Sequence, residues 1–91
     1  MKKILVTRKL LKPNEEKASK IFNTKLNSND ELYSQSKLIE LSKGCDGILT
    51  SITDKIDEET INKLPDNVKI ISNFAVGFGN IDLTAAKKRS I

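Results

Sequence analysis

Short apolar runs alternate along this chain with longer stretches in which apolar residues recur at helical spacing. The runs are "KILVT" at residues 3–7, "DGILTS" at 46–51 and "VKIIS" at 68–72. This alternation is typical of parallel strands that are joined by helical crossovers. The run at 68–72 is almost continuously apolar, which predicts a strand buried on both faces.

The first half of the chain is expected to hold two helices. One covers residues 14–22 after Pro13, a residue that suits the first turn of a helix. The second covers residues 35–43, with Ser34 or Ser36 as N-cap. Gly44 follows it, and glycine closes helices in the left-handed conformation. Between these helices, "NTKLNS" at 23–28 is polar enough for a strand at the sheet edge, followed by a loop.

Two further helices are expected in the second half. Asp57 is placed to cap residues 58–64, which end at Pro65, and Asp82 is placed to cap residues 83–89. The order is therefore β-α-β-α-β-α-β-α, with short right-handed connections. We expect an α/β fold, a flavodoxin-like doubly wound parallel sheet of about four strands. No strand follows the last helix, so the chain is expected to be a piece of something longer or a domain completed by a partner.

Composition narrows the function classes. The 91 residues carry a net charge of +4, but the lysines are spread along the chain and mixed with acidic residues. The tight basic run of Lys87, Lys88 and Arg89 falls in a last helical turn, where cations meet the negative end of the helix dipole. A nucleic-acid partner is therefore not expected. The apolar run near the amino terminus is too short for a signal peptide, and no membrane span is predicted.

The content of cysteine and histidine excludes several kinds of chemistry. Cys45 is the one cysteine and the chain has no histidine, so neither an internal disulfide nor a Cys/His zinc cluster is expected. No metal ligands are predicted, and a cytoplasmic location is. Cys45 is interpreted as a small buried hydrophobe before a strand, because no histidine is present to activate it.

Ligands of open parallel sheets bind beyond the carboxyl ends of the strands. The candidates at those ends are Thr7 with Arg8, Thr50 with Ser51, and residues 73–77. The last group has no ionisable side chain. The backbone N–H groups of Ala75, Val76 and Gly77 could converge on a carboxylate or a similar anion. The alternative is a tight turn that needs glycine only for its dihedral angles.

Three other candidate sites have structural explanations. "GFGNID" at 77–82 imitates the G-x-G-x-x-G dinucleotide fingerprint, but Asp82 replaces its third glycine. Asp54 and Asp57 could form a carboxylate pair for acid–base work or magnesium, yet Asp57 fits a helix N-terminus better. Arg8 could bind an anion, or it could be an ordinary exposed arginine.

Three segments resemble the N-terminal part of the D-isomer-specific 2-hydroxyacid dehydrogenases, nearest to glyoxylate and hydroxypyruvate reductases. They are "ILVTRKL", "GCDGILTSITDKID" and "VKIISNFAVGFGNIDLTAAKKRSI", and the pattern N-x-x-V-G-x-x-N-I-D from Asn73 to Asp82 is the most specific. Between Phe22 and Ser36 the similarity is weak. The resemblance implies that residues 1–91 form the N-terminal part of a substrate (catalytic) domain, without the nicotinamide-binding domain.

The resemblance also implies a substrate, a cofactor and an assembly. Val76 and Gly77, with Ala75 beside them, would present main-chain N–H groups to the carboxylate of a small 2-oxo or 2-hydroxy acid. The strand end at Leu49, Thr50 and Ser51 would line the same pocket. NAD or NADP and a homodimer are implied for the full-length enzyme.

No catalytic residues are expected within the chain, because the family's Arg, Glu and His belong to the segments that would follow. The 91 residues alone are expected to be inactive. Gly79 occupies a position where relatives often carry Asp. The competing hypothesis is a non-catalytic module that binds small acids or assembles with itself, and a nucleic-acid module is a third possibility.

Overall fold

The computed structural model describes residues 1–74 and 79–91. In this part of the chain, four strands and four helices alternate as the sequence predicts. The elements are β1 (Lys3–Val6), α1 (Lys12–Ile21), β2 (Asn23–Lys25), α2 (Gln35–Leu41), β3 (Gly47–Ser51), α3 (Glu58–Lys63), β4 (Ile70–Phe74) and α4 (Leu83–Lys88).

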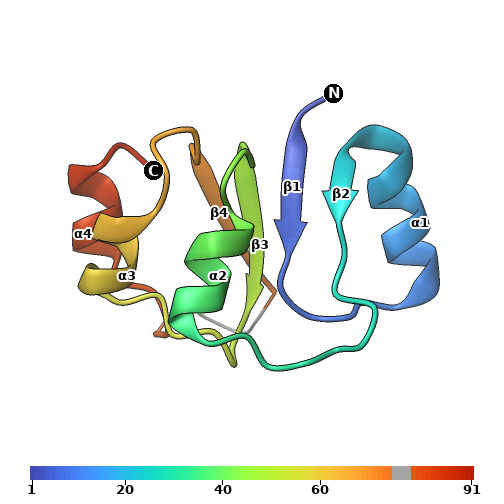
Figure 1. Cartoon of the computed structure of the whole chain (residues 1–91), viewed down its shortest axis with the longest axis horizontal. Coiled ribbons are helices and arrows are strands. Elements are labelled where there is room, and N and C mark those ends of the chain that lie inside the picture. The colour runs from blue at the N-terminus through green and yellow to red at the C-terminus, as the bar shows by residue number, and fades with distance from the viewer. Residues whose placement is uncertain (75–78) are drawn as a thin grey trace.

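The strands form one parallel sheet in the order β2-β1-β3-β4 (Figure 1). This is the beginning of the flavodoxin-like order 2-1-3-4-5, so the predicted fold class is confirmed. The short polar β2 lies at the edge of the sheet beside β1, as predicted. The strand order reverses direction between β1 and β3, which places their carboxyl ends at the switch point where ligands of such sheets bind.

Side-chain caps begin three of the four helices. Ser34 accepts from the N–H of Lys37 at 3.1 Å at the start of α2. Asp57 and Asp82 accept from the third helical N–H of α3 and α4 at 2.9 and 3.0 Å. Each such bond satisfies a backbone donor that the helix cannot pair. The predicted caps are confirmed, and Gly44 after α2 has the expected positive φ of 79°.

One face of the sheet carries the hydrophobic core. Leu5, Ile48 and Ile71 are partners in register on neighbouring strands, so their side chains share this face. The helices α2, α3 and α4 cover it with buried residues such as Leu38 and Ile61. Cys45, just before β3, is fully buried in the same cluster, as predicted.

The opposite face of the sheet is only partly covered. Exposed and half-buried residues alternate along β4, and Ile70 and Phe74 are 60% and 65% exposed. The expectation that residues 68–72 are buried on both faces is therefore wrong. The strand also begins two residues later than predicted. The physical reason is that α1 is the helix on this side, and it lies beside β2, at the far edge of the sheet from β4 (Figure 1).

The basic run near the end of the chain has a structural role at Arg89. Its guanidinium donates to the carbonyl oxygens of Ile61 and Leu64 at the end of α3, and to Asp66. These bonds add a charged donor to carbonyl oxygens at the end of α3, where backbone acceptors are left over. Lys87 and Lys88 lie in the last turn of α4, as the helix-dipole interpretation predicts.

Candidate functional site

The carboxyl ends of β1, β3 and β4 lie at the same end of the sheet, away from both chain termini (Figure 1). A cavity of about 410 Å³ opens there on the α1 side. Leu49, Thr50 and Ser51 at the end of β3 line it, together with Arg8 after β1 and Phe74 at the end of β4. Leu49, Thr50 and Ser51 thus line one cavity, whereas residues 75–77, which are predicted to share it, lie outside the described residues.

A buried carboxylate holds the loop that follows β3. Asp54 is only 4% exposed, and its Oδ2 accepts from the N–H of Ser51 at 2.9 Å. The hydroxyl of Thr7, at the end of β1, donates to the same oxygen. Asp54 N–H in turn donates to Ser51 O at 3.0 Å. The acid therefore couples the ends of β1 and β3, a role different from the metal or acid–base pair with Asp57 considered above.

Two asparagines lie on either side of residues 75–78 and bond to each other. Asn73 Nδ2 donates to Asn80 Oδ1 at 2.9 Å. Asn80 Nδ2 donates to Ser51 O at 3.0 Å and to Asp54 O at 2.9 Å. Thr50, which is 1% exposed, donates its hydroxyl to Asn73 Oδ1 at 2.9 Å. These bonds tie the end of β4 to the end of β3 and to the loop after it.

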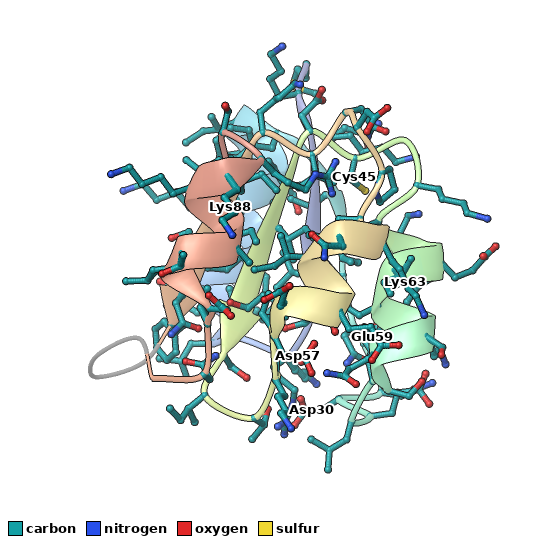
Figure 2. The ribbon with its side chains drawn as sticks, turned by 90° about the vertical axis from the view of Figure 1, so that its left-hand side faces the viewer. Asp30, Cys45, Asp57, Glu59, Lys63 and Lys88 are labelled. Carbon is teal, nitrogen blue, oxygen red and sulfur yellow. The ribbon has the colours of Figure 1, made fainter. Side chains whose placement is uncertain are left out.

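The charge of Arg8 is already matched within the chain. Its Nε lies 2.8 Å from Asp30 Oδ1, and its Nη1 donates to Thr53 Oγ1 at 2.9 Å. The hydrogen bond from Arg8, followed by that from the N–H of Lys9, lowers the pKa of Asp30 to about 2. The same bond raises the pKa of Arg8. Asp30 lies at the edge of the molecule in Figure 2, below Asp57 at the start of α3. Arg8 is thus neither an ordinary exposed arginine nor an unpaired anion receptor.

Not all of the predicted site falls within the described residues. Ala75, Val76 and Gly77, the predicted donors to a carboxylate, lie outside them. Neither the role of Asn80 nor the buried position of Asp54 is predicted from the sequence. A usable signal was present in both cases. Asp54 follows Ser51 by three residues, the spacing of a side chain that closes a turn, and Asn80 precedes an N-cap by two.

Two alternatives for this end of the sheet were a metal site and a dinucleotide-binding turn. Within residues 1–74 and 79–91, no three acidic, cysteine or histidine side chains are grouped as ligands of a metal. Asp82 occupies the position of the third fingerprint glycine and caps α4. No helix in this part of the chain has the length and apolar character needed to cross a bilayer.

Known proteins share both the sequence and the fold. The model of the catalytic domain of the D-isomer specific 2-hydroxyacid dehydrogenases matches residues 4–91. A glycerate dehydrogenase of Hyphomicrobium methylovorum is 33% identical over 99% of this chain, which spans 28% of that relative. A glyoxylate reductase of Thermococcus litoralis is 32% identical over 98% of the chain and 27% of the relative.

A solved structure extends the likeness to three dimensions. It comes from Polaromonas sp. JS6 66 and is described as a D-isomer specific 2-hydroxyacid dehydrogenase, NAD-binding. The TM-score is 0.95 with 25% identity, over 100% of this chain and 28% of that one. The chain thus spans less than a third of the length of the proteins it matches. Because the family model matches from Ile4 to Ile91, the chain belongs to the D-isomer-specific 2-hydroxyacid dehydrogenases, as a segment of their catalytic domain.

Proposed function

We propose that this chain is the N-terminal part of the substrate domain of an NAD(P)-dependent oxidoreductase that acts on small D-2-hydroxy acids. The match of residues 4–91 to the family's catalytic domain carries the proposal. The names of the relatives point to glyoxylate, hydroxypyruvate or glycerate as the type of substrate. The cavity bounded by Leu49, Thr50 and Ser51 is large enough for an acid of two or three carbons.

The carboxylate of that acid is held, in this proposal, by the main-chain N–H groups of Val76 and Gly77, with Ala75 beside them. Two observations support backbone donors at this edge. The segment follows β4 directly, at the carboxyl end of a parallel strand, where ligands of such sheets bind. The guanidinium of Arg8, which lines the cavity, is already engaged by Asp30 and Thr53.

The cofactor site and the catalytic residues are proposed to lie in the part of the relatives that this chain does not span. NAD or NADP supplies the hydride in the complete enzyme, which is proposed to be a cytoplasmic homodimer. Among the 91 residues no histidine is present to exchange a proton with the substrate. The chain alone should therefore oxidise NADH or NADPH no faster than a blank when glyoxylate or hydroxypyruvate is added.

Titration of the ¹⁵N-labelled chain with D-glycerate tests the carboxylate site. The backbone amide signals of Val76, Gly77 and Ser51 are expected to shift together and to saturate, with weak affinity because the site is incomplete. Glyceramide, which has the same hydroxyls but no negative charge, is the matched control and should leave these signals in place. Equal shifts with both compounds, or shifts elsewhere only, would overturn the assignment of the donors.

A second candidate is a non-catalytic module that binds small acids or assembles with itself. It is favoured by the exposed apolar side chains of Ile70 and Phe74 on the open face of the sheet. Sedimentation of the chain over a range of concentrations separates the two ideas in part. A strictly monomeric chain contradicts self-assembly, whereas a dimer that dissociates in an Ile70→Ser, Phe74→Ser variant supports it.

A further inference from the structure

Asn80 connects three segments of the chain and has no role in the proposed function. Its side chain contacts three separate segments: the end of β3 through Ser51 O, the following loop through Asp54 O, and β4 through Asn73. Its backbone is also committed, because Asn80 O accepts from the N–H of Ile56 at 2.8 Å.

The orientation of the Asn80 amide follows from these partners. Ser51 O and Asp54 O are both carbonyl oxygens, so only the NH₂ group of Asn80 can face them. Its Oδ1 then faces Asn73 Nδ2. Aspartate has the same shape but no donor, and in its ionised form would present negative charge to two carbonyl oxygens. The position therefore requires a side chain that has the size of asparagine and also donates hydrogen bonds.

We infer that Asn80 is a positioning residue for the acid-binding crevice, setting the end of β3 against the end of β4. Two of its partners lie at the crevice: Ser51 lines the cavity at the end of β3, and Asn73 lies near the end of β4. Asn73 also accepts from Thr50, so the four residues Thr50, Ser51, Asn73 and Asn80 form one connected set across the strand ends. The inference rests on the proposed function for the identity of the ligand, although not for the geometry of the crevice.

A small misplacement of binding groups has a large effect on a ligand that is held by directed hydrogen bonds. Loss of Asn80 removes the bonds that hold Ser51 O and Asp54 O against β4. The expected result is weaker acid binding, with the overall fold retained because the core lies on the face covered by α2, α3 and α4.

Asn67 provides a matched control. Its side-chain amide donates to Cys45 O, so it is another asparagine that ties the segment before β4 to the segment before β3. It does so at the amino ends of these strands, which is the opposite end of the sheet from the crevice. Cys45 lies near that end in Figure 2. Asn67→Ala removes the same kind of bond without touching the crevice.

The test compares Asn80→Ala, Asn80→Asp and Asn67→Ala in the 91-residue chain. D-Glycerate affinity is measured by the ¹⁵N titration, and thermal unfolding gives the stability of each variant. Both Asn80 variants are expected to bind at least about ten-fold more weakly than the unchanged chain. Asn67→Ala should bind as the unchanged chain does, even where its unfolding temperature falls as far. Unaltered affinity in a folded Asn80 variant, or an equal loss in Asn67→Ala, would overturn the inference.

A readout without ligand keeps this inference separate from the proposed function. In the Asn80 variants, the amide signals of Ser51 and Asn73 should move and their hydrogen exchange should accelerate, while those of Ile48 stay unchanged. If the unchanged chain fails to bind D-glycerate, the proposed carboxylate site fails and the ligand-free arm still decides the role of Asn80. Asn80→Ser, which keeps one hydroxyl donor, replaces any variant that does not fold.

Discussion

The two faces of the sheet differ in how they are covered. On one face, Leu5 and Ile48 lie in the core beneath α2, α3 and α4, and Ile71 packs against it. On the other, α1 contributes no fully buried residue, and Ile70 and Phe74 remain mostly exposed. The sequence patterns of the two faces are nonetheless both apolar. The difference shows that an apolar run predicts a strand well but does not reveal whether both of its faces have a partner.

The helices on the two sides also begin differently. Ser34, Asp57 and Asp82 cap the three helices of the covered face by accepting from backbone N–H groups. Leu11 at the start of α1 makes no such bond. The covered face therefore combines packing with satisfied helix ends, whereas α1 is expected to be the least stable helix of the chain.

The largest expected contrast is between two isoleucines. Ile48→Ala removes a fully buried side chain from the covered face and should lower the free energy of unfolding by about 3 kcal/mol. Ile70→Ala, on the open face, should lower it by less than about 1 kcal/mol because most of the side chain is already in water. Urea unfolding of both variants measures the difference. Similar losses would mean that the open face is packed in solution.

Two aspartates give the next contrast. Asp54→Ala leaves the Ser51 N–H and the Thr7 hydroxyl without their buried acceptor, which should cost about 2 kcal/mol. Asp30→Ala removes an exposed ion pair with Arg8 and should cost much less, because water and salt screen that pair. Denaturation at pH 7 tests both. The prediction is contradicted if the Asp30 variant is the less stable of the two.

Changes to the helix caps should have smaller effects on the free energy of unfolding. Removal of a cap on the covered face should lower it, and addition of a cap to α1 should raise it. Asp57→Ala removes an existing N-cap and is expected to cost about 1 kcal/mol. Leu11→Asp adds a cap and a favourable charge at the start of α1, for a gain of about 0.5 kcal/mol. Unfolding temperatures and amide exchange within α1 report the outcome. A loss of stability in Leu11→Asp would show that Leu11 is needed for packing.

The smallest expected effect is a pH dependence on the open side. The pKa of Asp30 is lowered from 3.8 in the unfolded chain to about 2 in the folded one. Its contribution is therefore complete above pH 3.8 and is lost as the pH falls from there towards 2. In Arg8→Gln the pKa should return towards 3.8, as followed by NMR of the Asp30 carboxyl carbon. An unchanged pKa would assign the shift to the N–H of Lys9.

Local patterns predicted most of the fold. Apolar runs indicated β1, β3 and β4, and short polar side chains indicated the caps at Asp57 and Asp82, because both signals act within a few residues. The exposure of β4 was not predictable in this way, since it depends on where a distant helix lies. A strand end also indicated Leu49, Thr50 and Ser51, which line the cavity; their role in binding stays a prediction. The joint between Asn73 and Asn80 depends on contacts across the sheet.

The three-residue run from Asn80 to Asp82 has consequences for protein engineering. Asn80 holds the strand ends, Ile81 forms a parallel bridge with Ile56, and Asp82 caps α4. Adjacent residues perform these three tasks, so an inserted residue puts at least one of them out of register. Libraries that vary loop length should therefore leave this run intact.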